Sequence, residues 1–145
     1  MRTLRRLPLL LAAALSIGTM VGAKCPTGSV TVRGRVGNLP STAAGLEVTV
    51  VVESRNGPVT RTASLSNGEF TVEVPFSTHS SSFLGSDRCH TVPTFVEVKV
   101  VTTGKVYVQK RINFKDSFEM TRQYEYRLKQ ELSLEVPNDR TNGTN

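Results

Sequence analysis

Apolar and polar residues alternate along most of the chain from residue 29 to residue 136, which is the pattern of β-strands with one buried face. The alternation predicts six strands before residue 114, at 29–36, 46–53, 59–65, 70–74, 95–102 and 105–113. Asn67-Gly68 is the clearest turn signal, because Asn-Gly supplies the two positive φ angles of a tight hairpin. Two residues interrupt the inward faces of these strands. Gly34 replaces a side chain in the first strand, and Arg61 predicts an edge position or a paired charge in the third.

The apolar spacing between residues 124 and 136 fits either a helix or a strand. Tyr124, Leu128 and Leu132 lie four apart, as on one face of a helix. A period of two explains more of the apolar positions, which are Tyr124, Tyr126, Leu128, Leu132, Leu134 and Val136. We therefore expect one strand interrupted near Gln130, or two strands joined by a bulge. Residues 114–121 are expected to be irregular, with three apolar side chains covering the open end of the core: Phe114, Phe118 and Met120.

The first 23 residues have the layout of a signal peptide. Three arginines precede the apolar run 9–21, and the segment ends with small residues at Gly22 and Ala23. A helix of 13 residues spans only about 20 Å, short of the roughly 30 Å core of a bilayer. We therefore expect a cleaved signal and no stable membrane anchor, and we expect the mature protein to be secreted or periplasmic.

The mature chain is long enough for one domain with a modest core. We expect a single β-sandwich domain at 24–136, followed by a polar, disordered tail at 137–145. Seven strands with short turns and no substantial helix predict an all-β fold, a seven-stranded antiparallel sandwich. An immunoglobulin-like sandwich is the main structural alternative, but the chain has no Trp for the Cys-Trp-Cys framework of antibody domains.

A long serine-rich loop, 75–94, separates the predicted strands and contains both histidines. Loops of this length in compact domains are usually functional or mobile. Its candidate contact residues are Phe76, His79, Phe83, Leu84, Asp87 and His90. We expect a disulfide between Cys25 and Cys89, because an even cysteine count in an oxidising compartment usually indicates a bridge. The alternative is a reactive thiol at Cys89 beside His90.

Charge and motif spacing exclude several chemistries. The formal charge falls from +6 to +3 without the signal, and the remaining basic residues are interleaved with acidic ones, so we expect no nucleic-acid surface. His79, Asp87, Cys89 and His90 fit no zinc spacing, and no Gly-x-Ser-x-Gly motif occurs. We expect no catalytic residues, no metal and no cofactor. Tyr124 and Tyr126 are interpreted as core or interface aromatics in preference to a platform on which a sugar stacks. Asn142 has the form of an N-glycosylation acceptor.

Three short motifs together resemble a known family. They are Gly-x-Val at 34–36, Ala-Gly-x-x-Val at 44–48 and Ser-Asn-Gly-Glu-Phe at 66–70. This series is similar to the carboxypeptidase regulatory-like domains of the transthyretin-like, or prealbumin-like, superfamily. The resemblance implies a non-catalytic extracellular module with a chaperoning, spacer or recognition role.

The same superfamily includes the hydroxyisourate hydrolase, which the resemblance associates with a Tyr-Arg-Gly-Ser terminus and active-site histidines. This chain ends in Arg-Thr-Asn-Gly-Thr-Asn at 140–145, and its Tyr126-Arg127 pair is followed by Leu-Lys. We therefore expect a secreted, non-catalytic module with a binding or structural role and an unknown protein or carbohydrate partner. The contact surface would be the 75–94 loop, with an edge strand as a second surface. The alternative is a small-ligand carrier or a hydrolase of the superfamily.

Overall fold

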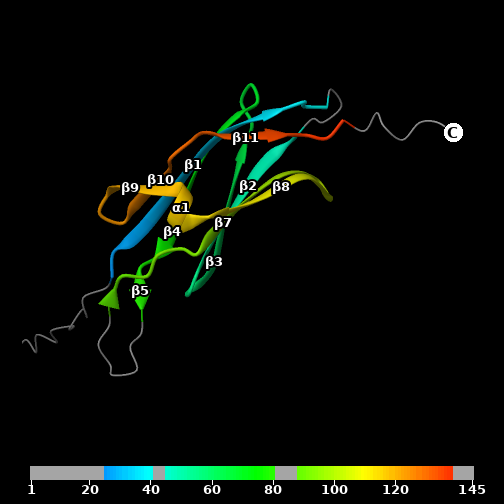
Figure 1. Cartoon of the computed structure of the whole chain (residues 1–145). Coiled ribbons are helices and arrows are strands. Elements are labelled where there is room, and N and C mark those ends of the chain that lie inside the picture. Colours follow the sequence, from blue (N-terminus) through cyan, green and yellow to red (C-terminus); the bar gives the residue numbers. More distant parts are fainter. Residues whose placement is uncertain (1–24, 41–44, 81–87, 139–145) are drawn as a thin grey trace, which may run out of the picture.

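A computed structural model describes residues 25–40, 45–80 and 88–138, and the expected signal peptide and residues 139–145 of the expected tail lie outside this part. The described chain is an all-β sandwich with one short helix, as the alternation predicts (Figure 1). The elements in chain order are β1 (Thr27–Gly37), β2 (Glu47–Ser54), β3 (Gly57–Ser64), β4 (Glu69–Ser77), β5 (His79–Ser80), β6 (Arg88–Cys89), β7 (Phe95–Thr102), β8 (Lys105–Asn113), α1 (Phe114–Ser117), β9 (Phe118–Arg122), β10 (Glu125–Leu128) and β11 (Leu132–Glu135).

The first sheet is built around β1. On one side β1 pairs antiparallel with β4, and on the other side it pairs parallel with β10 and then with β11. β9 pairs antiparallel with β10 at the outer edge. β10 and β11 thus form one interrupted line, which confirms the expected break near Gln130. The parallel pairing corrects the expectation of a purely antiparallel sandwich, since an alternating pattern is the same for either strand direction.

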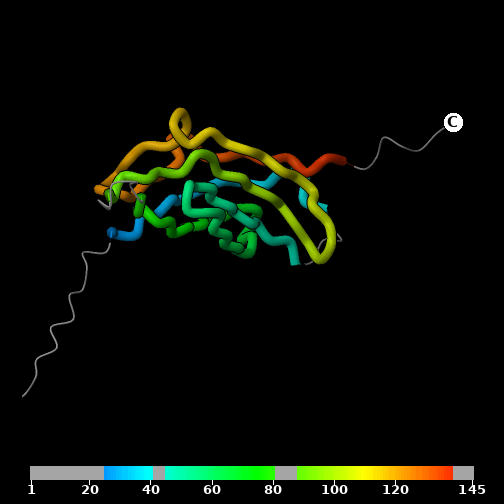
Figure 2. Tube along the Cα trace, turned by 90° about the horizontal axis from the view of Figure 1, so that it is seen from below, coloured from blue at the N-terminus to red at the C-terminus, as the bar shows by residue number. Residues whose placement is uncertain are grey.

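The second sheet has the order β3-β2-β7-β8 and is antiparallel throughout. β3 is an edge strand and Arg61 is exposed on it, which confirms the edge position predicted from that residue. The hairpin that joins β3 to the first sheet has positive φ angles at Asn67 and Gly68, and Ser66 and Glu69 exchange backbone hydrogen bonds of 2.9 Å. The predicted tight turn is therefore confirmed. The first and last described residues lie at opposite ends of the elongated domain (Figure 2).

The core lies between the two sheets and is built largely of valine. The valines with no exposed surface are Val30, Val32, Val48, Val50, Val52, Val74, Val96, Val98 and Val100. Aromatic rings close the end of the core near α1, where Phe114 stacks on Phe118 with ring centroids 5.0 Å apart. The Tyr126 ring packs edge-on against Phe114 at 5.0 Å, which confirms Tyr126 as a core aromatic, and burial raises the pKa of its hydroxyl.

Several local expectations differ from the structure. Residues 114–121, expected to be irregular, form α1 and most of β9. Phe114 and Phe118 are buried as expected, but Met120 is 62% exposed and covers no core. Tyr124, expected to begin a strand, lies in the turn between β9 and β10 with φ 63°. β5, β6 and β9 are strands beyond the seven expected, because tertiary pairing extends segments that are too short or too irregular for the periodic pattern to reveal.

Candidate functional site

Within the expected contact loop 75–94, the two short strands β5 and β6 pair at one end of the sandwich (Figure 1). They are the base of a small hairpin, in which His79 faces Cys89 and Ser80 faces Arg88. The segment 81–87, which contains the predicted contact residues Phe83, Leu84 and Asp87, lies outside the described residues. The hairpin base is therefore the part of the candidate site whose geometry is defined.

A disulfide attaches this base to the start of β1. Cys25 and Cys89 form the bond, with an S–S distance of 2.06 Å and a Cα–Cα distance of 5.2 Å. The predicted bridge is confirmed, and the reactive-thiol alternative is wrong because neither cysteine is free. A disulfide is compatible with an extracellular or periplasmic location, where such bonds persist.

Two buried threonines add hydrogen bonds beneath the hairpin. The Thr78 hydroxyl donates to the Pro26 carbonyl oxygen at 2.5 Å, so the chain leaving β4 is attached to the residue after Cys25. Thr91, just past β6, donates its backbone N–H to the Thr78 carbonyl at 3.0 Å and its hydroxyl to the His79 carbonyl at 3.1 Å. Buried hydroxyls are costly when unpaired, and both of these hydroxyls donate to backbone carbonyls.

The turn between β2 and β3 provides a further attachment from the opposite sheet. The Asn56 side-chain amide donates to the carbonyl oxygens of Ser77 at 3.2 Å and His79 at 2.7 Å. In the sequence Asn56 is recognisable only as a turn residue. Its contact with a segment more than 20 positions away depends on how the two sheets pack, so no local signal could reveal it.

The structure divides the described contact residues into two groups. Phe76 is only 2% exposed and covers Gly28 from the neighbouring strand, so its assignment to a contact loop is wrong. The expected strand ends at residue 74, directly before Pro75. β4 is an edge strand, where a missing N–H leaves no ladder bond unmade, so the alternation continues to Ser77. His79 is half-buried and His90 is exposed.

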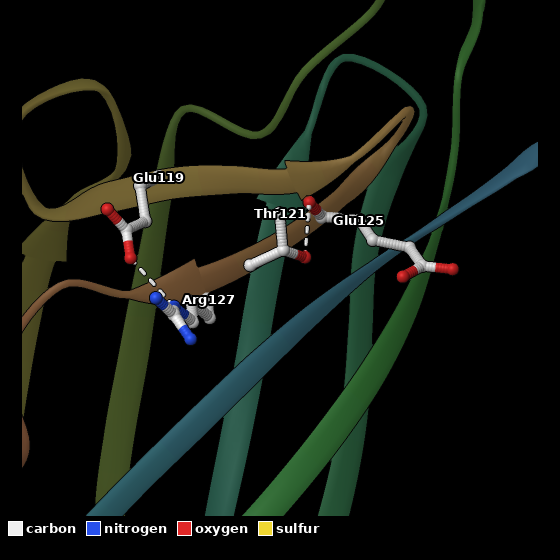
Figure 3. A network of polar contacts seen from close by, with 4 residues as sticks. All are labelled: Glu119, Thr121, Glu125 and Arg127. Atoms are coloured by element: carbon white, nitrogen blue, oxygen red, sulfur yellow. Dashed lines mark hydrogen bonds and ion pairs between the residues drawn. The ribbon is translucent and has the colours of Figure 1, made fainter.

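The outward face of the first sheet is a second polar surface. It contains a shallow hollow of about 620 Å³. Figure 3 shows part of it, where the Arg127 Nε donates to a Glu119 carboxylate oxygen at 2.7 Å between β10 and β9. Beside this pair the Thr121 hydroxyl donates to the Glu125 carbonyl oxygen at 3.3 Å. Exposed ion pairs of this kind contribute about 1 kcal/mol or less, so this arrangement is typical of a solvated sheet face.

The outward face of the second sheet also has paired charges. The Lys99 ammonium lies 2.6 Å from a Glu97 carboxylate oxygen, and the Gln109 amide donates to the other oxygen at 2.8 Å. These two hydrogen bonds hold the pKa of Glu97 below its ordinary value. Within the described ranges, no group of three or more metal-ligating side chains converges on either face or at the hairpin.

No helix in the described part of the chain is long and apolar enough to cross a membrane. Comparisons with protein-family models, with curated proteins and with solved structures find no match to this chain. The fold and the site therefore define the protein as an all-β sandwich with an intramolecular disulfide and a cross-linked hairpin base at one end.

Proposed function

We propose that this chain is a secreted, non-catalytic β-sandwich module that binds a protein or carbohydrate partner outside the cell or in the periplasm. The observation that carries the proposal is the attachment of the hairpin base at Cys25, Pro26 and Asn56. Surfaces that are ordered before binding lose less conformational entropy when a partner arrives. The cross-linked base is thus suited to presenting a contact surface.

The contact surface would consist of the exposed residues around this base. Arg88 and His90 are exposed on and beside β6, and Val92 is an apolar side chain with 46% of its surface exposed. An apolar side chain beside cationic and imidazole groups offers both burial and hydrogen bonding to a partner. The expected signal peptide and the resemblance to transthyretin-like domains support an extracellular role.

The alternative role is that of a small-ligand carrier or a hydrolase of the transthyretin-like superfamily. Ligand sites for small molecules are usually concave, mostly apolar and largely enclosed. The hollow on the outward face of the first sheet is open and lined mainly by charged and hydroxyl side chains, so it does not favour a carrier. The binding role is preferred for this reason.

Site-specific photo-crosslinking of the secreted protein tests the proposal. A photoreactive amino acid at His90 should capture a reproducible partner from the extracellular fraction. The same amino acid at Thr60, an exposed position on β3, should not capture it. Equal capture at both positions, or a small molecule retained in native mass spectrometry in place of a captured partner, would contradict the proposal. The measured mass of the secreted protein should equal that of a chain whose first residue is Lys24.

A further inference from the structure

The two sides of the sandwich differ in how their strand edges are covered. On one side the hairpin at 66–68 joins β3 to β4, and these strands contact each other across the two sheets. On the other side, α1 leads from β8 to β9, and among the described strands β9 pairs with β10 alone. β11 has β1 along one edge and no strand of the described chain along the other.

The backbone of β11 has hydrogen-bonding groups directed toward this open edge. In a parallel pair, alternate residues direct both N–H and C=O to the same neighbour. The Val136 N–H donates to the Gly37 carbonyl at 3.1 Å, so Leu132 and Leu134 are the residues that bond to β1. Ser133 and Glu135 therefore direct their N–H and C=O groups away from β1. The Lys129 N–H follows the same alternation and donates to Ser117, on the side away from β1.

A groove of about 520 Å³ runs beside this edge, between β11 and the second sheet. Ile112 and Leu132 contribute buried apolar side chains to its floor, and Leu128 is half-buried there. An extended chain pairing with Ser133 and Glu135 would place every second side chain on this apolar floor. The remaining side chains would lie on the outward face of the first sheet.

Lys110, Asp116 and Lys129 also line the groove, so the charges that distinguish a partner lie on the outward face beside this edge. The outward side chains along the line of β11 are Glu131, Ser133 and Glu135, and all three are exposed. Glu131 lies 3.5 Å from Arg35, which also pairs with Glu69. Opposite charges on neighbouring strands stabilise pairing, so an added strand is favoured when its outward residues are basic.

We propose that the open edge of β11 binds an extended segment of a partner protein in which Lys or Arg alternates with Val, Ile or Leu. The main chain of the segment pairs with Ser133 and Glu135, its apolar side chains pack on Ile112 and Leu132, and its basic side chains face the glutamates. The inference rests on the proposed binding role, but it uses a surface other than the hairpin. Strand addition of this kind combines main-chain bonds with alternate side-chain pockets.

Fluorescence anisotropy with labelled peptides tests this site on the mature protein. A hexapeptide of alternating Lys and Val should bind, whereas alternating Glu and Val, or the same Lys and Val in two blocks, should bind at least tenfold more weakly. The affinity of the alternating Lys peptide should fall as salt is added, because the charges that it contacts are exposed. Equal binding of all three peptides, or no binding, would overturn the proposal.

Two substitutions locate the interaction on β11. Ser133→Pro removes an N–H that faces the open edge and makes no hydrogen bond to β1, so the fold should persist. Peptide affinity should fall at least tenfold, because the peptide loses this hydrogen bond. Met120→Pro is the matched control. Arg127 pairs with Glu119, so the Met120 N–H faces the outer edge of β9 in the same sheet, and this proline should leave binding unchanged. Equal affinity in wild type and Ser133→Pro would overturn the assignment.

A charge variant keeps the test valid if the proline perturbs folding. Glu131→Gln with Glu135→Gln should weaken binding of the Lys peptide several-fold, while Glu119→Gln on β9 should not. A dimer without peptide that Ser133→Pro converts to monomer would overturn the proposal in favour of a second copy of this chain as the occupant. Failure of peptide binding with intact crosslinking at His90 rejects this inference and leaves the proposed function standing.

Discussion

Two glycines of β1 leave room for the two phenylalanines of β4. Gly28 lies opposite Phe76 and Gly34 lies opposite Phe70 in the antiparallel register, all on the inward face. The three atoms nearest to a Cβ atom on Gly28 would all belong to the Phe76 ring, at 2.3 to 2.8 Å. A Cβ atom on Gly34 would also lie 2.5 Å from the backbone carbonyl oxygen of Leu132. The first obstruction is a side chain that can be shortened, whereas the second includes backbone that cannot.

This difference predicts unequal rescue of the two glycine substitutions. Gly28→Ala and Gly34→Ala should each lower the free energy of unfolding by about 1–3 kcal/mol through overpacking. Adding Phe76→Leu to Gly28→Ala should recover much of the loss, whereas adding Phe70→Leu to Gly34→Ala should recover less. Double-mutant cycles from urea denaturation measure both couplings. Equal coupling energies in the two cycles would show that the Leu132 carbonyl imposes no constraint.

The edge strands of the second sheet each have a basic residue at an inward-facing register position. Arg61 of β3 pairs with Val50 of β2, Val50 pairs with Val98 of β7, and Val98 pairs with Lys110 of β8. The row thus has two buried valines in its centre and an exposed cation at each end. Charges on the inward side of edge strands prevent sheets from adding to one another. This pattern explains why a basic residue interrupts an otherwise apolar face.

Arg61→Val should therefore promote association through β3. The substitution makes the inward face of an exposed edge strand continuously apolar, so we expect concentration-dependent oligomers in light scattering, with the monomer retained in wild type. Arg33→Val removes the same charge from the outward face of β1, in the interior of the first sheet, and should stay monomeric. A monomeric Arg61→Val at high concentration would mean that other features protect this edge.

Periodicity predicted those strands whose burial alternates along their own length. β2 and β7 have a buried valine at every second position, and the sequence defines them to within a residue. β9 was missed because only Phe118 of its five residues is buried. The sequence also could not show that β10 and β11 run parallel to β1, because the alternation of inward and outward side chains is the same for parallel and antiparallel neighbours.

The candidate site was only partly predictable from the sequence. Cys25 and Cys89 were identifiable because their pairing follows from compartment and number. Asn56 and Thr78 support the hairpin through carbonyl groups, and any residue provides a carbonyl, so the sequence contains no sign of their partners. The open edge of β11 was expected only as an unspecified edge strand, because strand order within a sheet has to be known before its edges can be named.

For the chain as a whole, the disulfide joins residues 64 positions apart and closes a loop that contains β1 to β6. Replacing both cysteines, Cys25→Ser with Cys89→Ser, should lower the free energy of unfolding by about 4 kcal/mol on the chain-entropy model. Urea denaturation of the oxidised wild type and the double variant measures the difference. Reduced wild type serves as the control and should match the double variant. An unchanged midpoint would show that the bond contributes nothing to stability.

The parallel pairing of β1 with β10 and β11 also sets an order in time. The ribosome makes β1 first among the strands and its two parallel partners last, so the first sheet cannot be completed before nearly the whole domain has been synthesised. Contacts between distant parts of a chain form slowly, because the intervening loop must be closed first. Under the proposed secretion this delay is useful, because a chain that folds late stays unfolded while it is translocated. A nascent chain that stops before residue 125 leaves one side of its first strand without a partner.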